Sequence, residues 1–446
     1  MAETVAKTAT PIGTVAPVAA PRRGPILALL AGNIVSLVGS SLTAIALPWF
    51  VLQTTGSAAK TGLVGFFGLL PALIAGVFGG VLVDRLGYKR VSVASDVVSL
   101  VGVALVPLLY DTVGLAFWQL LMLVFVARLL NLPGLTARRA LLPELAQLAH
   151  WRLERINASF ESVNALAMLL GPPLAGLLVA VMGANNVLWL DAASFAVSAA
   201  LVAGAIPAVA VTPQVIGRYG EALMSGLRFL WHDRLLRAMA ATLALSNFLG
   251  ASLFAVLLPV FVKETYGQAT VLGLIFSASG LGQLLGAVAY GAFGPRVPRR
   301  VIWLVGFSLM PLGYWMLGVG VPLVVLVVTL AVTGFFTGPI NPLMVTIRHE
   351  RIPPELRGRV FSTYSAVASG AQPLGLLLGG LAVQGTGVRA TALIFALAAQ
   401  AVGIGMFFVP ALRAMRTPPS TPEQLNRQYS PEGARKTPRK ANTRIH

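Results

Sequence analysis

The chain has 446 residues, of which 56% are hydrophobic and 11% are charged, and its formal net charge is +18. A soluble domain is about half apolar and about a quarter charged, so this composition indicates an integral membrane protein instead. The absence of cysteine excludes disulfides, thiolate metal sites and cysteine nucleophiles, and the four histidines are too widely spaced for a metal site. We therefore expect no metal and no cofactor.

Twelve apolar stretches follow one another along the chain, each long enough to cross a bilayer as a helix. They predict an all-α membrane protein with spans at 25–52, 58–83, 91–110, 114–134, 157–182, 186–207, 238–262, 270–293, 301–318, 321–344, 360–384 and 388–410. Residues 136–155 are expected to form a connector along the membrane surface.

A polar stretch at 208–237 divides the spans into six and six. Its leucines beside arginines predict an amphipathic helix at the membrane interface. The expected organisation is a tail, a six-helix half, this linker, a second six-helix half and a basic tail, at 1–24, 25–207, 208–237, 238–410 and 411–446. Both tails have the composition of disordered segments.

Lysine and arginine are distributed unevenly between the two sides of the predicted bundle. Of the 33 such residues, 29 fall in the tails and in alternate loops, and the opposite loops hold only Lys60, Lys263 and Arg389. The positive-inside rule then places both tails in the cytoplasm of a multi-pass protein of the inner (plasma) membrane. Since topology explains the basic surplus, we expect the lipid bilayer and not nucleic acid as a partner.

A short polar loop joins spans two and three, so these two helices must be antiparallel neighbours. It combines small, acidic and basic residues, namely Gly80, Asp84, Arg85, Gly87, Lys89 and Arg90. An ordinary cytoplasmic loop explains the three cations but neither Asp84 nor the glycines, which favour a sharp turn and close helix contact.

Charged side chains inside the spans are rare and concentrate in the first half. Asp96, Arg128 and Glu161 are all placed in the cytoplasmic third of their helices. Unpaired charge is costly in a membrane, so they either neutralise one another or face a water-filled cavity. Asp191 lies about 9 Å from the outer surface by helical rise and is expected to bond a neighbouring hydroxyl or amide.

Other polar and helix-bending residues also lie inside spans. Gly171, Pro172, Pro173 and Gly176 predict that span five is bent and tightly packed. The amides inside spans are Asn33, Asn164, Asn247, Gln283, Asn341 and Gln372. Each alone fits a hydrogen bond between helices, whereas the set also fits a substrate cavity near the bilayer midplane.

An internal repeat relates the two halves. A constant shift of 210 residues aligns Gly76 with Gly286, Arg90 with Arg300, Asn131 with Asn341, Arg138 with Arg348, and Pro143 with Pro353. Because each half has six spans, the two copies have the same orientation and are related by an axis along the membrane normal. The second copy of the short loop has Gly294 at the position of Asp84, so the halves are unequal.

With its twelve spans, its loop motif and its repeat, the chain resembles the major facilitator superfamily over residues 25–410. The segments Arg155–Ala158, Gly171–Gly176, Asp191–Phe195 and Gly358–Ser362 are similar to the twelve-span drug:proton antiporter branch, which includes macrolide and enterobactin exporters. Gly171–Gly176 matches the branch's antiporter motif with Ala175 in place of a glycine, and Arg128 matches the arginine of its span-four motif.

The resemblance implies a monomeric exporter of amphipathic or hydrophobic small molecules that works by proton antiport and rocker-switch alternating access. It implies a gate in which Asp84 caps the start of span eleven near Gly358 and Arg359 and holds the outward-facing state. Asp96, Arg128 and Glu161 are then the candidates for proton coupling. Glu161 is the foremost candidate, because its protonation would change as the cytoplasmic side opens and closes.

Alternative functions also fit the sequence. Within transport, the chain could export one siderophore, lysolipid or metabolite. A transporter-like receptor or scaffold without flux is a second alternative, and an enzyme is not expected because no nucleophile, metal or cofactor constellation is found.

Overall fold

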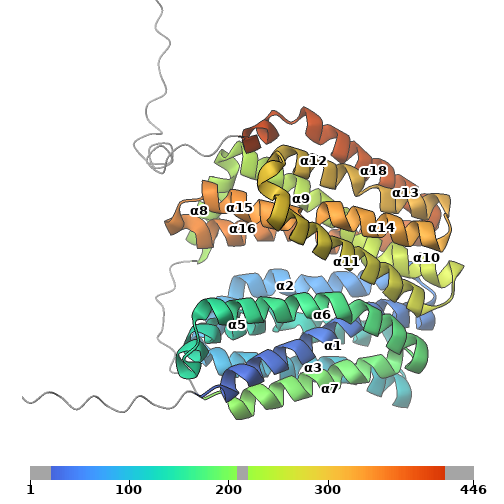
Figure 1. Cartoon of the computed structure of the whole chain (residues 1–446). Coiled ribbons are helices and arrows are strands. Elements are labelled where there is room, and N and C mark those ends of the chain that lie inside the picture. The colour runs from blue at the N-terminus through green and yellow to red at the C-terminus, as the bar shows by residue number, and fades with distance from the viewer. Residues whose placement is uncertain (1–21, 208–218, 417–446) are drawn as a thin grey trace, which may run out of the picture.

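The computed structural model describes residues 22–207 and 219–416, and within these ranges the chain is helical without strands. Twelve of its helical segments are long and apolar enough to cross a membrane. They are arranged in two six-span bundles, with the C-terminal half above the N-terminal half in Figure 1. This arrangement confirms the all-α, two-half architecture predicted from the sequence.

The N-terminal half is built from seven helices that make six spans. They are α1 (Gly24–Thr55), α2 (Ala58–Leu86), α3 (Tyr88–Thr112), α4 (Phe117–Leu129), α5 (Asn131–Ala149), α6 (Leu153–Met182) and α7 (Ala184–Ala205).

In the C-terminal half, several spans are divided into two consecutive helices. The elements are α8 (Tyr219–His232), α9 (Arg234–Ser252), a π-helical turn η1 (Leu253–Leu257), α10 (Leu258–Thr265), α11 (Ala269–Phe293), a 3₁₀ turn η2 (Gly294–Arg296), α12 (Arg299–Leu309), α13 (Leu312–Val319), α14 (Leu323–Thr337), α15 (Ile340–Arg351), a 3₁₀ turn η3 (Pro354–Leu356), α16 (Arg357–Gly370), α17 (Gln372–Thr386), α18 (Val388–Phe408) and a final 3₁₀ segment η4 (Pro410–Arg416).

Single glycines make three of the sharpest connections between spans. Gly87, Gly183 and Gly387 each end one helix and begin the next, with φ of 87°, 83° and 83°. L-residues with a side chain rarely adopt this backbone region, so glycine is required where one residue reverses the chain. Gly87, which lies in the short loop predicted between spans two and three, therefore makes the turn that joins α2 to α3.

The fourth span differs from the sequence prediction. Helix α5 continues the direction of α4, and the pair forms one span from Phe117 to Ala149 instead of a span followed by a surface connector. One face of α5, including Arg138 and Leu141, is buried. Arg138 and Arg139 obscured this continuation in the sequence, because their partners Asp96 and Glu161 come from other helices. As a result, Arg128 lies near the middle of its span rather than in its end third.

The predicted linker and C-terminal tail are partly ordered. Helix α8 packs on α16, and Gly226 of α8 lies against Arg359 and Thr363. Beyond the last span, η4 buries Leu412 and Met415 against the C-terminal half, so residues 411–416 belong to the fold. The remaining tail and linker residues, 1–21, 208–218 and 417–446, lie outside the described residues.

The two ends of the bundle differ in how the halves meet. We call the end that carries the Lys/Arg-rich loops the basic end and the opposite end the far end; they lie at the left and right of Figure 1. Each hydrogen bond between a described residue of one half and a described residue of the other joins far-end residues: Ser57 and Ala59 with Gln384, and Lys263 with the Leu52 carbonyl.

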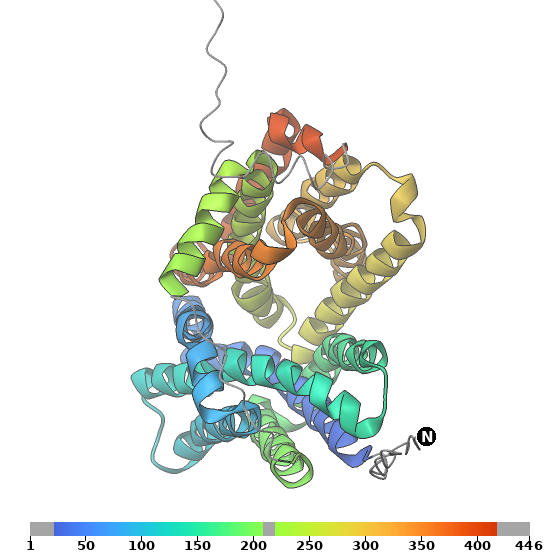
Figure 2. The same ribbon diagram turned by 90° about the vertical axis from the view of Figure 1, so that its left-hand side faces the viewer.

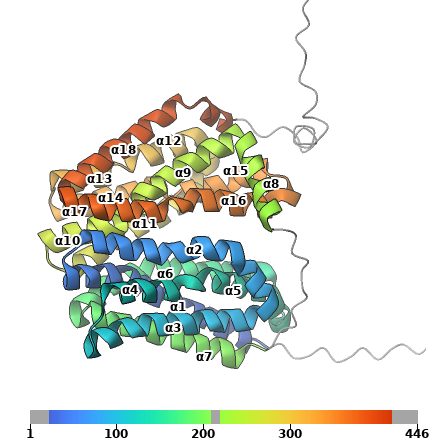
Figure 3. The ribbon, with the colours of Figure 1, turned by 180° about the vertical axis from the view of Figure 1, so that it is seen from behind.

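Glycines allow the closest contacts between the halves. In α2 and α17, Gly62 lies against the Leu376 carbonyl and Gly380, and in α6 and α11, Gly176 lies against Gly273. Figure 3 shows α2 running alongside α16 and α17. Figure 2, viewed from the basic end, shows the two bundles as separate groups of helices. The far end therefore holds the halves together through close backbone approach at these glycines and through a shared cluster of buried apolar side chains, including Trp49 of α1 and Val256 of η1.

Replacing Gly62 with valine is expected to loosen this far-end contact. A Cβ there would lie 2.9 Å from the Gly380 Cα, closer than real Cβ atoms pack, and overpacking of this kind costs about 1–3 kcal/mol. Because the chain lacks cysteine, spin labels can be attached at Val113→Cys and Val319→Cys, two exposed far-end sites, one in each half. Gly62→Val should lengthen the distance between these labels.

Gly385→Val is the matched control. Gly385 lies in α17 near Gly380, the residue that Gly62 contacts, but a Cβ at Gly385 meets nothing within 4 Å. It should leave the distance distribution unchanged. An unchanged distribution in Gly62→Val would show that the Gly62 contact does not hold the halves together.

Candidate functional site

A cavity of about 400 Å³ lies within the C-terminal half. Four of the six amides predicted to line a substrate cavity lie on its wall, and they come from α9, α11, α15 and α17: Asn247, Gln283, Asn341 and Gln372. Four hydroxyl residues and several apolar residues complete the wall, among them Phe254, Phe307 and Met310. Its volume falls in the range of small-molecule sites, about 300–1,000 Å³.

The four amides differ in whether their side chains form hydrogen bonds with other described residues. Asn247 Nδ2 donates to the Ala368 carbonyl at 2.8 Å and so ties α9 to α16. Gln283, Asn341 and Gln372 make no side-chain hydrogen bond with any described residue. Each amide offers two donors and one acceptor, so these three can bind a ligand that carries both kinds of group.

The other two predicted cavity residues lie in the N-terminal half, where they bond each other. Asn33 Nδ2 donates to Asn164 Oδ1 at 3.2 Å, and Asn33 Oδ1 accepts from Arg138 Nη1 at 3.2 Å. Asn164 Nδ2 also donates to Glu161 Oε2 at 3.2 Å. Asn33 and Asn164 do not line the 400 Å³ cavity, so their place in a shared substrate cavity stays a prediction. Here they link charged groups.

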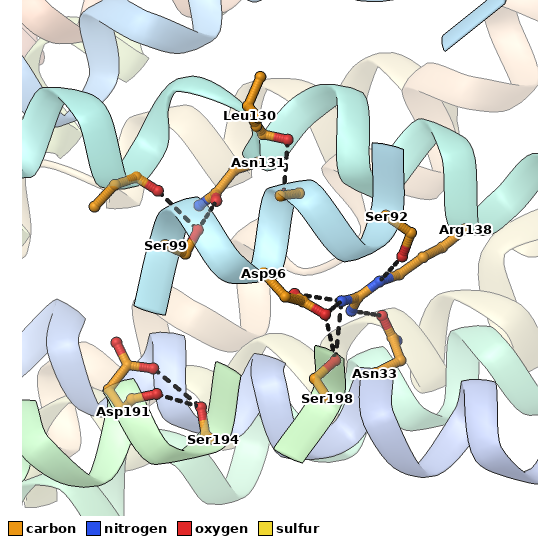
Figure 4. A network of polar contacts seen from close by, with 12 residues as sticks. Asn33, Ser92, Asp96, Ser99, Leu130, Asn131, Arg138, Asp191, Ser194 and Ser198 are labelled. Atoms are coloured by element: carbon orange, nitrogen blue, oxygen red, sulfur yellow. Dashed lines mark hydrogen bonds and ion pairs between the residues drawn. The ribbon is translucent and has the colours of Figure 1, made fainter. Parts of the chain in front are cut away.

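The centre of the N-terminal half is a buried ion pair (Figure 4). Arg138 Nη2 contacts the two carboxylate oxygens of Asp96 at 2.5 and 2.6 Å, while Arg138 Nε donates to Ser92 at 3.1 Å. Ser198 Oγ donates to Asp96 Oδ2 at 2.7 Å. Asp96 and Arg138 are only 2% and 5% exposed, so the surrounding hydroxyls and Asn33 supply the partners that two buried charges need.

Glu161 does not pair with Arg128. It bonds Arg139 at 3.0 Å, and the Glu161 side chain is 62% exposed. Through Asn164 and Asn33, Glu161 is connected to the buried pair of Asp96 and Arg138 by an unbroken series of hydrogen bonds.

Arg128 also lacks the predicted partners. The acidic group whose charge acts on it is Asp191. Asp191 accepts from Thr43 and, at 3.2 Å, from Ser194, in agreement with its predicted bonding to hydroxyls. The mutual neutralisation of Asp96, Arg128 and Glu161 is therefore wrong, because Asp96 pairs with Arg138 and Glu161 pairs with Arg139.

Arg138 is the functional-site candidate that the sequence analysis missed. Its signal was the recurrence of arginine at Arg348 in the repeat, which indicated that the position matters but not what it contacts. In the second half Arg348 is also buried, but its guanidinium lies 4.8 Å from the Phe361 ring and 4.9 Å from the Tyr364 ring. Gly306 takes the place of Asp96, with Ile340 and the Phe336 carbonyl packed against it.

The predicted gate residues lie at the basic end. Arg85, Lys89 and Arg90 surround a second cavity with Gly87, and Gly358 and Arg359 are exposed at the start of α16. Gly80 and Asp84 lie in α2, but the Asp84 side chain is outside the described residues.

The predicted antiporter motif lies inside α6, which also contains Pro172 and Pro173. Gly171 lies against Ser41 of α1, and Gly176 makes the far-end contact with Gly273. No group of three or more histidines and acids suited to a metal ion occurs among the described residues.

Comparison with known proteins links this geometry to one family. A model of the Major Facilitator Superfamily matches residues 29–267 and, again, 240–442. The chain is 33% identical over 404 residues to the Multidrug efflux pump Tap of Mycolicibacterium fortuitum, covering 88% of this chain and 98% of that protein. It is 24% identical over 372 residues to Macrolide efflux protein A of Streptococcus pyogenes, covering 80% and 89%.

Solved structures share the fold. The nucleoside transporter NupG is similar with a TM-score of 0.71 and 16% identity, over 86% of this chain and 98% of that one. A bacterial homologue of the iron transporter ferroportin, in an inward-facing state, is similar with a TM-score of 0.62 and 18% identity, over 85% and 98%.

Removing one partner of the buried pair is expected to destabilise the protein strongly. Asp96→Asn or Arg138→Gln leaves the other charge buried, which typically costs about 3–5 kcal/mol. In the double variant the loss should be smaller than the sum of the two single losses, because no isolated charge remains. Thermal and denaturant unfolding of the purified variants measures these differences.

The neighbouring arginine provides the control. Arg139→Gln removes an ion pair whose side chains are both more than half exposed, and such pairs contribute about 0–1 kcal/mol. If Arg138→Gln is no more destabilising than Arg139→Gln, the buried pair does not stabilise this half.

Proposed function

This chain belongs to the major facilitator superfamily, and we propose that it exports amphipathic or hydrophobic small molecules from the cell in exchange for protons, as a monomer in the inner membrane. The observation that carries the proposal is the amide-lined cavity in a two-half transporter whose halves touch mainly at one end. The efflux named for the Mycolicibacterium and Streptococcus relatives supports the direction of transport.

The basic loops support an orientation with the basic end in the cytoplasm. In that orientation the far end faces outward, and this structure is an inward-facing state with its outer side closed. Substrate would then reach Gln283, Asn341 and Gln372 from the cytoplasm or the inner leaflet. A rocking motion that breaks the far-end glycine contacts and closes the basic end would release the substrate outside.

The N-terminal half holds the groups for proton coupling. Glu161 is exposed in this state and is connected through Asn164 and Asn33 to the buried pair of Asp96 and Arg138. We propose Glu161 as the carboxylate that exchanges protons with the cytoplasm. Protonation of Glu161 would weaken its bonds to Arg139 and Asn164, and the rearranged amides would alter the support of Arg138. Arg128, which feels the charge of Asp191 but makes no ion pair with a described residue, would then keep an accessory role deeper in the half.

Glu161→Gln tests the coupling. The variant should bind the substrate and exchange it passively but lose efflux driven by a proton gradient, because a neutral amide cannot release a proton. The measurement uses proteoliposomes with an imposed pH difference and a compound that stabilises the purified protein in a ligand screen. Solute counterflow in the absence of the gradient reports passive exchange.

Glu154→Gln is the matched control, since Glu154 is an exposed acid of the same helix, paired with Arg152 at 3.6 Å. It should pump normally. Gradient-driven efflux with normal proton movement in Glu161→Gln would reduce Glu161 to a structural role, and absence of any substrate movement in the unmodified protein would refute the proposed function itself.

The loop between α2 and α3 is proposed as the gate of the basic end. When the two halves close there, Asp84 would approach the start of α16 near Gly358 and Arg359, where a helix N-terminus favours negative charge. Its repeat counterpart Gly294 has no carboxylate, so only one such latch is available.

Asp84→Asn is expected to shift the protein toward the inward-open state by removing this charge–dipole contact. Spin labels at Leu86→Cys and Glu355→Cys, both exposed at the basic end, report the separation of the two halves there. The variant should lose short distances relative to the unmodified chain. Identical distributions in the two proteins would rule out the latch.

A further inference from the structure

No charged residue lies among the described residues that line the C-terminal cavity. Its lining consists of four amides, four hydroxyl residues and ten glycine or apolar residues. The described acids of this half lie elsewhere: Asp233 and Glu350 pair with Arg351 and Arg299, while Glu264 and Glu355 lie at helix ends. A charged ligand group in this cavity would therefore find no opposite charge on the wall.

Comparison with the first half explains why the Asn341 amide forms no hydrogen bond with another described residue. In the first half its counterpart Asn131 accepts a hydrogen bond from Ser99 at 3.0 Å. The residue equivalent to Ser99 is Leu309, which cannot donate one. Asn341 thus keeps all of its hydrogen-bonding capacity, and it does so on the cavity wall.

Approximate interaction energies favour the binding of a neutral ligand group over a charged one in this cavity. Taking an ion out of water costs several kcal/mol unless it is paired, and the aromatic rings of Phe254 and Phe307 offer a cation only about 0.5–2 kcal/mol. Hydroxyl and carbonyl groups of a ligand, by contrast, can satisfy the donors and acceptors of the three uncommitted amides, which otherwise remain without protein partners.

We infer that the cavity binds the uncharged, hydroxyl- and carbonyl-bearing part of an amphipathic molecule, with Gln283, Asn341 and Gln372 as specificity-determining residues. This inference rests on the proposed export function, because it takes the cavity to be the substrate site. The Phe254, Phe307 and Met310 side chains contact the apolar part of the same molecule. Discrimination against charged analogues follows from the missing counter-charge and not from size.

The test compares binding of two neutral probes, digitoxin and podophyllotoxin, with a lipophilic cation, tetraphenylphosphonium, and a carboxylate, pyrenebutyrate. Affinities are measured on the full chain in lipid nanodiscs at pH 8 without a proton gradient. At least one neutral probe should bind the unmodified protein tenfold or more tightly than both charged probes. Asn341→Leu, which removes the amide, should weaken neutral binding by about three- to tenfold.

Asn341→Asp adds a carboxylate of nearly the same shape and should move the preference toward the cation by tenfold or more. Asn131→Asp makes the same chemical change at the repeat counterpart, which does not line the cavity, and should leave the preference unchanged.

The inference is overturned if neither neutral probe binds more tightly than the charged ones, or if both Asn341 variants keep the preference of the unmodified protein. Neutral binding without transport in the proteoliposome assay would support the inference while refuting the export function. If the protein transports charged compounds and the Asn341 variants do not change its preference, the export function is supported and the inference about the cavity is refuted.

Discussion

A polar group inside a bilayer needs a partner, because no water surrounds it and an unsatisfied group costs several kcal/mol. The N-terminal half meets this constraint within itself: Arg138 and Asp96 neutralise each other, and Ser92, Ser198 and Asn33 satisfy the remaining atoms. The C-terminal half has three amides around a cavity that bond none of the described residues. The same constraint thus produces a rigid polar core in one half and a ligand-accepting wall in the other.

Different residues at equivalent positions of the repeat account for this difference between the halves. Both copies retain a buried arginine and an asparagine at equivalent positions. In the second copy, glycine stands in place of Asp96 and Leu309 in place of Ser99, so Arg348 packs against aromatic rings and Asn341 lines the cavity. Acids inside the spans of the first half and neutral amides in the second agree with the proposed division between proton coupling and substrate selection.

Hydrophobic length and charge asymmetry predicted most of the spans and their division into two halves, because these features depend on local composition, and residue identities at a constant shift of 210 revealed the repeat. The fourth span was the exception. Which polar side chains bond one another could not be predicted from the sequence. Arg138 was assigned to a surface connector, since the polar residues around it gave no sign that Asp96, Ser198 and Asn33 converge on it from three other helices. Likewise, all six amides had the same sequence signal, and only the packing separates Asn33 and Asn164 from those around the cavity.

Exchange between two conformations requires that the contact between the halves be specific but inexpensive to break. The far-end contacts bring backbones together at Gly62, Gly176, Gly273 and Gly380, and apolar side chains such as Leu376 against Gly65 pack beside them. Apolar contacts leave no unpaired charge when they separate, whereas separating a buried ion pair would leave two uncompensated charges. Charged pairs such as Asp96 with Arg138 lie inside one half, where a rocking motion leaves them intact. Placing the buried charged pair within one half and mainly apolar contacts between the halves therefore lets the halves move as rigid bodies without separating buried charges.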